Sequence, residues 1–350
     1  MKHKFLIISS LLVFFSYALF SQSDTVFVSL GGEMSADKIY NEGVQLYERG
    51  SLQKAISKFD EAIRLNPRFA KAYNNKGLAL SDMQEYEKAI NSFTKSINIE
   101  PSAVGYFGRA RAKHELNKLE EALTDYNLAI KYDEDMSHAY YYIASAFFEK
   151  DEYEDAVKNY TIAIEKRSDY AYAYNDRGSA YRRLEKYDLA EKDYREAIRL
   201  DPSLAIFYNN LGSLLKVSGK IQKAIIQYSK AIDIDPEYYI AVNNRGIAKY
   251  DNKDYQGAIA DYKKVISINS EYAYAYNNIG NAYYKLKDYE NAEKYFNDAI
   301  RKNSDYGYAY LNRGNTREMM RMLDEACDDW KKAASLGVSS AQSYVNQICR

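Results

Sequence analysis

Apolar side chains recur along this chain at helical spacing, and the pattern repeats every 34 residues with one copy of 33. In each copy, positions 4, 7, 8 and 11 form one apolar stripe, and positions 17, 20, 24, 27 and 28 form another. Spacings of three and four residues place side chains on one face of a helix. The pattern predicts two amphipathic helices per copy, over nine copies: 36–69, 70–102, 103–136, 137–170, 171–204, 205–238, 239–272, 273–306 and 307 to about 337.

Small and large residues alternate in fixed columns of the repeat. Position 20 is alanine in every copy, position 8 is glycine or alanine, position 4 is mostly tyrosine, and position 24 is always aromatic. A large side chain packed beside a small one gives a dense interior where two helices cross closely. After the last copy, Ala341, Tyr344, Val345 and Ile348 share one helical face, so we expect residues 338–350 to hold a C-terminal capping helix.

The repeat resembles a known family. Residues 275–284 read Ala-Tyr-Asn-Asn-Ile-Gly-Asn-Ala-Tyr-Tyr and are followed by Tyr289, Ala292, Phe296 and Ala299, a pattern similar to the tetratricopeptide repeat (TPR) family. The resemblance implies an all-α fold, a right-handed α-solenoid of about nine helix-turn-helix repeats over residues 36–337. It also implies that positions 2, 5, 6, 9, 12 and 13 of the first helices face a concave groove.

Asparagine dominates two of these groove columns. Position 6 holds Asn41, Asn75, Asn210, Asn244, Asn278 and Asn312, and position 5 holds Asn74, Asn175, Asn209, Asn243 and Asn277. An amide offers a donor and an acceptor, so such a ladder could bind the backbone of an extended peptide, as in superhelical members of the family. The alternative is that these residues are solvated and inherited from the repeat consensus.

Aromatic residues interrupt the asparagine columns in repeats 3 and 4. Phe107, Tyr141 and Tyr142 stand there, joined in register by Tyr172 and Phe148. An exposed aromatic surface suggests an anchor pocket for a partner, whereas rings that lean into neighbouring helices would be structural. The clamp by which some family members bind chaperone tails needs lysine at position 5, and this sequence lacks it there. We therefore do not expect that function.

The N-terminus has the layout of a secretory signal peptide. A basic start is followed by an apolar run from Phe5 to Phe20 and then by Ser21-Gln22-Ser23. We expect residues 1–21 to be removed and residues 22–35 to form a short linker, which predicts a secreted, periplasmic or envelope protein of a bacterium. The alternative is an N-terminal segment retained as a membrane anchor. The length of the apolar run argues against it, because the run is shorter than the roughly 20 residues of a spanning helix.

Charge and chemistry exclude several classes of function. The formal charge is −1 with no basic stripe, which argues against nucleic acid as a partner. His114 and His138 would lie about 15 Å apart along parallel helices, too far for one metal ion. Acidic residues are spread over the repeats, and we expect them on solvated helix faces. No cofactor site or catalytic motif is found, so we expect no enzyme.

Cys327 and Cys349 are the only cysteines. In an exported protein they could form a disulfide that fixes the capping helix, and two buried thiols are the alternative. Together these features predict a non-enzymatic scaffold for protein–protein interaction that binds an extended peptide or a partner domain in its groove. The alternative is a structural or accessory subunit of an envelope enzyme or secretion complex that contacts its partners through the convex face.

Overall fold

The computed structural model describes residues 35–349, and over this range the protein is helical with short turns. The predicted signal peptide lies outside the described residues. The molecule divides into two compact units, an N-terminal unit that ends at Ser168 and a C-terminal unit that begins at Asp169.

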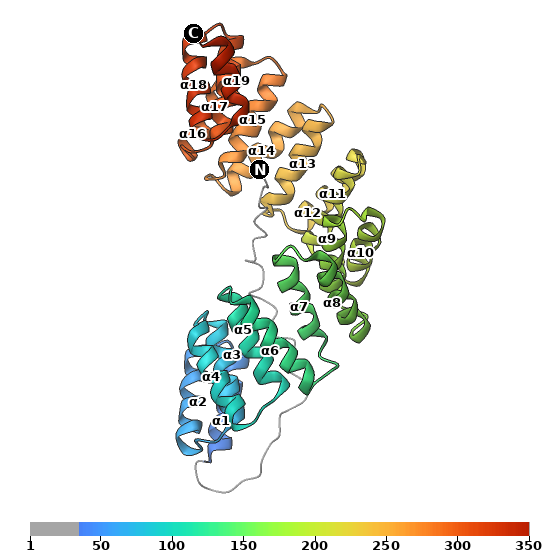
Figure 1. Cartoon of the computed structure of the whole chain (residues 1–350), viewed down its shortest axis with the longest axis vertical. Helices are drawn as coiled ribbons and strands as arrows, with labels where there is room; N and C mark the ends of the chain where they lie inside the picture. Colours follow the sequence, from blue (N-terminus) through green and yellow to red (C-terminus); the bar gives the residue numbers. More distant parts are fainter. Residues whose placement is uncertain (1–34, 350) are drawn as a thin grey trace. The chain divides into compact units, whose positions relative to one another are not determined.

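The helices follow one another in sequence as antiparallel pairs (Figure 1). The N-terminal unit contains α1 (Ala36–Glu48), α2 (Leu52–Leu65), α3 (Ala70–Asp82), α4 (Tyr86–Ile99), α5 (Ala103–Glu115), α6 (Leu119–Tyr132), α7 (Ser137–Glu149) and α8 (Tyr153–Lys166). The C-terminal unit contains α9 (Ala171–Arg183), α10 (Tyr187–Leu200), α11 (Ala205–Val217), α12 (Ile221–Ile234), α13 (Tyr239–Asp251), α14 (Tyr255–Ile268), α15 (Ala273–Lys285), α16 (Tyr289–Lys302), α17 (Gly307–Met319), α18 (Leu323–Ser335) and α19 (Ser339–Ile348). The predicted all-α array of helical hairpins is confirmed.

The small position-8 residue of each first helix makes room for the ring at position 24 of the second helix. A Cβ added to Gly246 would lie 2.6 Å from Cε1 of Tyr262, and one added to Gly280 would lie 2.6 Å from Cε1 of Phe296. Both rings are buried. Such a distance is far inside van der Waals contact, so glycine is required for this close crossing despite its cost to helix stability of about 1 kcal/mol relative to alanine.

The turn inside each repeat has a left-handed residue at position 15. This residue is a glycine in some repeats, as at Gly50 and Gly219. In others it carries a side chain, as at Lys253 and Lys287, whose φ angles are 65° and 62°. The N–H of Lys253 donates to the carbonyl of Tyr250, and the next N–H donates further back, which satisfies the carbonyls at the end of α13. A side chain in this region costs roughly 1–2 kcal/mol, so the turn hydrogen bonds must offset that cost.

The first helices of successive repeats contact one another in each unit, for example α3 with α5 and α9 with α11. Successive second helices are not in comparable contact in the part of the protein that the structure describes. Because the first helices lie closer together, each stack curves with its first helices on the inner side. The first helices therefore line the concave face of each unit.

The C-terminal unit ends in the predicted capping helix α19. The Tyr344 ring stacks on the buried Trp330 ring at 4.9 Å between centroids. Cys327 of α18 and Cys349, the residue after α19, form a disulfide with their Cα atoms 5.5 Å apart. The capping helix therefore covers the hydrophobic face of the last repeat, and the disulfide links it covalently to α18. Among residues 35–349, no helix has the length and apolar character needed to cross a membrane.

Candidate peptide-binding face

The asparagines of the C-terminal unit form an amide relay between neighbouring first helices. In this relay, the position-6 asparagine of one repeat donates to the position-5 asparagine of the repeat before it. The Nδ2–Oδ1 distances are 3.0 Å for Asn210 to Asn175, 3.0 Å for Asn244 to Asn209, 3.5 Å for Asn278 to Asn243, and 2.9 Å for Asn312 to Asn277.

The relay corrects the expectation that both asparagine columns face a ligand. Asn175, Asn209, Asn243 and Asn277 are buried, and the carboxamide oxygen of each accepts the hydrogen bond from the next repeat. These side chains hold repeats together because position 5 lies at the seam between helices. The position-6 asparagines are only partly buried, so the part of their amide that the relay leaves unused remains within reach of a ligand.

The N-terminal unit builds the same seam differently. Nδ2 of Asn75 donates to the hydroxyl of Tyr40 over 2.8 Å, because tyrosine stands at position 5 of repeat 1. Asn41 is partly buried on α1. In repeat 3, position 6 is Gly108, and a Cβ there would lie 2.5 Å from the Phe93 ring. The ladder breaks at this point because a ring of the preceding repeat fills the space.

The predicted aromatic residues of repeats 3 and 4 form a packed cluster. Phe107 is 6% exposed and lies 5.6 Å from Tyr142 between ring centroids. Tyr142 also stacks on the buried Tyr126 at 5.9 Å, and Tyr141 meets Tyr142 edge-on. Phe107 therefore belongs to the core, which corrects the expectation of an exposed ring there. Tyr141 and Tyr142 stay partly exposed.

Tyr172 belongs to the C-terminal unit. Its ring packs edge-on against the buried Phe207 ring, with 5.5 Å between centroids. Tyr172 stands at position 2 of repeat 5, whereas Tyr141 stands at position 5 of repeat 4, so Tyr172 packs on a core of the C-terminal unit and is not part of the cluster of repeats 3 and 4.

Several acidic residues expected on solvated faces are instead buried in ion pairs. Asp125, Asp193, Asp261 and Asp329 at position 23 are nearly inaccessible, and each binds an arginine at position 7 of its own repeat through both carboxylate oxygens. The partners are Arg109, Arg177, Arg245 and Arg313. Two parallel hydrogen bonds of this kind are strong and geometrically specific.

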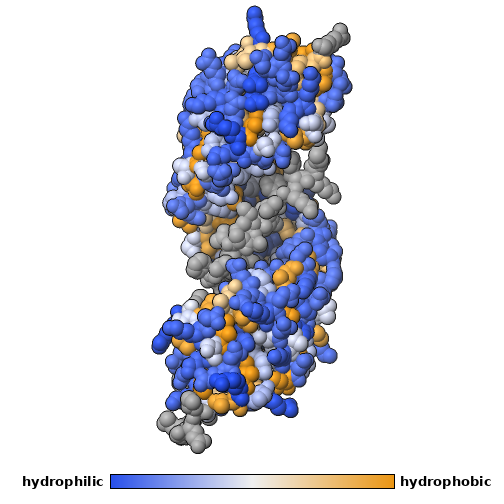
Figure 2. Space-filling view, turned by 90° about the vertical axis from the view of Figure 1, so that its left-hand side faces the viewer, coloured by the Kyte–Doolittle hydropathy of each residue, from blue (hydrophilic) through white to orange (hydrophobic). Residues whose placement is uncertain are grey.

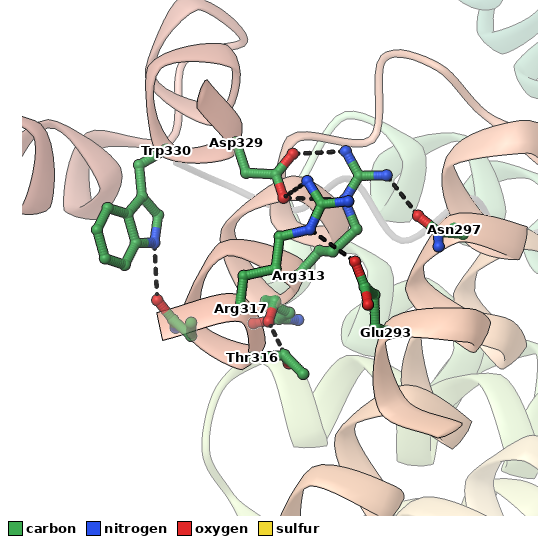
Figure 3. Close-up of polar contacts among 9 residues, drawn as sticks. Glu293, Asn297, Arg313, Thr316, Arg317, Asp329 and Trp330 are labelled. Carbon is green, nitrogen blue, oxygen red and sulfur yellow. Dashed lines mark hydrogen bonds and ion pairs between the residues drawn. The ribbon is translucent and has the colours of Figure 1, made fainter. Parts of the chain in front are cut away.

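Figure 3 shows one of these ion pairs. Arg313 binds Asp329 and also donates to Asn297 on the second helix of the preceding repeat, while Arg317 bridges Asp329 and Glu293. The arrangement joins three helices. The arginine–aspartate pair recurs in repeats 3, 5, 7 and 9, so a period of two repeats is superimposed on the period of one. Arginine at position 7 and aspartate at position 23 occur together in every second repeat from repeat 3 on, and this co-occurrence is the sequence signal from which the ion pairs could have been predicted.

His114 and His138 have different surroundings. Nε2 of His114 lies 3.0 Å from Oε1 of Glu149 on the next first helix. His138 is partly buried, and this burial together with the charges of Arg167 and Arg111 lowers its pKa to about 4. Within residues 35–349, no group of three or more histidine, cysteine, aspartate or glutamate side chains could hold a metal ion.

Two half-exposed tyrosines stand at the N-terminal ends of α15 and α17, at position 2 of repeats 8 and 9. Tyr274 is 51% exposed and Tyr308 is 47% exposed. The Tyr274 ring lies 4.8 Å from that of Tyr306 and 5.4 Å from that of Tyr272, between centroids. Tyr239 extends the row at 5.4 Å from Tyr272. We call Tyr239, Tyr272, Tyr274, Tyr306 and Tyr308 the tyrosine strip.

Other exposed apolar side chains are dispersed. Leu189 and Ile226 project from second helices, and Val217 and Met319 lie at the C-terminal ends of first helices. In Figure 2 the hydrophobic residues of the visible face form small separate patches within a mostly hydrophilic surface. Isolated exposed apolar residues are normal, whereas a contiguous aromatic row is not. The tyrosine strip is therefore the notable feature of the described surface.

Comparisons with known proteins agree with this architecture. Models described as tetratricopeptide repeat match residues 70–102, 171–204 and 273–306, and residues 103–136 and 205–238. A third model, described as TPR repeat, matches 43–84, 144–184 and 248–287. A search of curated protein sequences gives no match.

Solved structures show the same fold. A tetratricopeptide repeat protein from Parabacteroides merdae is 19% identical with a TM-score of 0.57, over 71% of this chain and 99% of that one. Yeast Tom70 is 18% identical with a TM-score of 0.55, over 86% and 68%. The pilF protein of Pseudomonas aeruginosa is 19% identical with a TM-score of 0.52, over 61% and 97%. At these identities the likeness concerns the fold alone.

The segments matched by the three family models together cover more than half of the sequence. Those of the two tetratricopeptide repeat models coincide with helix pairs of the structure. The columns of small and aromatic residues that define the repeat are also those that pack where helices cross. The chain therefore belongs to the tetratricopeptide repeat family.

Proposed function

We propose that this protein is a non-enzymatic scaffold of the cell envelope that binds a polypeptide partner along the first helices. The tyrosine strip of the C-terminal unit carries this proposal. Four of its five rings pack on one another in a chain of contacts from Tyr239 to Tyr306. A partner that covers Tyr274 and the exposed Tyr308 would bury large aromatic surfaces at a small cost in side-chain entropy. Tyrosine is also among the residues that dominate binding energy at protein interfaces.

Two features support an envelope location. The N-terminal sequence has the layout of a signal peptide. The disulfide between Cys327 and Cys349 closes the C-terminal end of the array, and disulfides persist chiefly in oxidising compartments. We therefore propose export with removal of residues 1–21. N-terminal sequencing of protein isolated from its native cells would test the cleavage, and thiol labelling of the denatured, unreduced protein would test the disulfide.

Photo-crosslinking in the native cells tests the binding role. A benzophenone amino acid would replace Tyr308 in one strain and Ile226 in another. Ile226 is a matched control because it is also about half exposed but lies on the second helix α12. We expect the probe at 308 to crosslink a discrete partner, and the Tyr274→Ser substitution to reduce its yield. Crosslinking at 226 alone would refute binding along the first helices.

The second candidate function is that of an accessory subunit that contacts its complex through the second helices. Leu189 on α10 and Ile226 on α12 favour it, since each is about half exposed on a second helix. The same experiment decides between the two functions, because the accessory role requires the crosslink at 226 and predicts none at 308.

A further inference from the structure

The C-terminal unit has an open notch between the second helices α10 and α12, over the first helix α11. Its volume is about 270 Å³. Leu211 of α11 is buried there, and the partly exposed side chains of Ile198 and Tyr208 complete an apolar lining. The notch is smaller than the roughly 300–1,000 Å³ of small-molecule sites, so it suits a single apolar side chain.

The notch is open because repeat 6 departs from the ion-pair pattern of its neighbours. Its lining includes position 25 of repeat 5 and positions 7 and 23 of repeat 6, which are Arg195, Leu211 and Gln227. Where repeat 6 meets repeat 7, the same three positions hold Ser229, Arg245 and Asp261. There the guanidinium of Arg245 bridges the junction, since it binds Asp261 and its Nη1 donates to Oγ of Ser229 over 3.1 Å.

The later junctions of this unit are filled as well. Between repeats 8 and 9, Arg313 binds both Asp329 and Asn297. Between repeats 7 and 8, position 23 holds Tyr295, whose ring stacks on that of Tyr283 with 5.6 Å between centroids. A leucine at position 7 and a glutamine at position 23 form no such bridge. The space that an arginine or a ring occupies elsewhere is therefore accessible between repeats 5 and 6.

Three cations surround the apolar lining. Arg195 and Arg199 belong to α10, and Lys230 belongs to α12. Each arginine pairs with a glutamate of its own helix, but both arginines are exposed, and exposed ion pairs are weak enough to exchange with a ligand. Lys230 forms no ion pair within residues 35–349, and its Nζ lies 5.8 Å from the centroid of the Tyr208 ring.

We propose that this notch binds an extended acidic segment of a partner polypeptide, with one apolar side chain in the notch and a carboxylate on either side of it. Cations flank the apolar lining on both α10 and α12, so the charges of such a segment are complementary to the site. In an extended chain, every second side chain lies on the same face. Acidic residues two positions before and after the apolar residue would therefore meet these cations.

This inference goes beyond the proposed function. The notch lies between second helices and does not include any residue of the tyrosine strip. An acyl chain of a lipid would need a longer apolar surface than a notch of about 270 Å³ provides, which favours a polypeptide over an anionic lipid.

Nuclear magnetic resonance of full-length protein with ¹³C-labelled isoleucine methyl groups tests this proposal. The probe is the peptide Glu-Ser-Leu-Ser-Glu, acetylated and amidated at its ends. We expect the methyl resonance of Ile198 to shift saturably. Ile266 is the internal control, because it stands at the same position 28 of repeat 7, beside the junction that Tyr295 fills, and its resonance should not move. Replacing the two glutamates of the peptide with glutamine, or its leucine with alanine, should weaken binding at least about tenfold.

Two variants of the protein separate the notch from its charges. The triple variant Arg195→Ser, Leu211→Arg and Gln227→Asp copies into this junction the residues found between repeats 6 and 7. It should fill the notch and abolish the saturable shift while the helical fold is kept. Lys230→Gln removes one exposed cation, so it should weaken binding without any change in circular dichroism.

Equal shifts at Ile198 and Ile266, equal affinity for the glutamate and glutamine peptides, or a folded triple variant that still binds would overturn the proposal. A shift caused by phosphatidylglycerol vesicles and not by the peptide would also overturn it, because the notch would then be a lipid site. Failure of this inference is distinct from failure of the proposed function, since the crosslink at position 308 is measured at the tyrosine strip and does not depend on the notch.

Discussion

Replacement of Asp261 by alanine offers the most direct test of how the buried ion pairs stabilise the array. Oδ1 and Oδ2 of Asp261 lie 2.7 and 2.9 Å from Nη2 and Nε of Arg245, and Lys249 reaches Oδ2 at 2.9 Å. Asp261 is 4% exposed, whereas the Arg245 and Lys249 side chains keep about a fifth of their exposure. The substitution therefore leaves two cations that are only partly solvated.

The expected cost follows from the loss of one partner of a buried pair, which is about 3–5 kcal/mol. Because both cations retain some access to water, we expect a value near 3 kcal/mol, at the lower end of that range. Repeat 6 provides the matched control. It has Leu211, Leu215 and Gln227 at the positions that hold Arg245, Lys249 and Asp261 in repeat 7.

A triple variant that copies those three residues into repeat 7 should lose much less stability than Asp261→Ala. The two leucines and the uncharged glutamine remove all three charges together with their desolvation cost, so no unpaired charge is left in the interior. Urea unfolding followed by circular dichroism gives the total change, and hydrogen exchange of α13 and α14 shows whether the loss is local, as expected for stacked repeats. A loss below about 1 kcal/mol for Asp261→Ala, or equal losses for both variants, would refute the reasoning.

Three other variants test separate features. Gly246→Val should destabilise by about 1–3 kcal/mol because its side chain would clash with the buried Tyr262 ring, and an unchanged urea midpoint would contradict that crossing. Asn244→Ala should cost about 1–2 kcal/mol because Oδ1 of Asn209 loses its donor, and a neutral result would show that the relay is not a stabilising contact. Burial lowers the pKa of His138 to about 4, below its unfolded value near 6.5, so stability should fall as the pH falls across that window. His138→Gln should flatten this loss in urea midpoints measured between pH 7 and 4.5.

The helical hairpins could be predicted from sequence because each repeat presents the same columns nine times. A small residue such as Gly246 can pack directly against a ring such as that of Tyr262 where two helices cross. Because the same pair of columns recurs in every repeat, the pattern cannot be a coincidence. The chemistry of the concave face was harder to predict. Whether Asn209 faces a ligand or the next helix depends on a rotation of a few tens of degrees, which periodicity alone does not resolve.

The burial of the aspartates could not be predicted from periodicity either. In the sequence, Asp261 resembles any other polar residue of a second helix. Its partner Arg245 lies sixteen residues earlier, on the first helix of the same repeat, and only the fold brings the two together. Burial of a charge is set by such partners and not by the residue itself. Phe107 is the converse case, since its ring occupies a groove column but turns into the core of repeats 3 and 4.

The amide relay gives the array a direction. Each position-5 asparagine of the C-terminal unit accepts a hydrogen bond from the repeat that follows it, so this bond forms only if another repeat follows. Repeat 9 has Leu311 at that position, packed in the cluster that holds Trp330 and Val338 beneath the capping helix. The leucine side chain has no hydrogen-bond acceptor, so the amide relay ends at repeat 9. Continuing the amide relay beyond repeat 9 would require an asparagine in place of Leu311, whereas a repeat copied into the middle of the relay would bring both its donor and its acceptor with it.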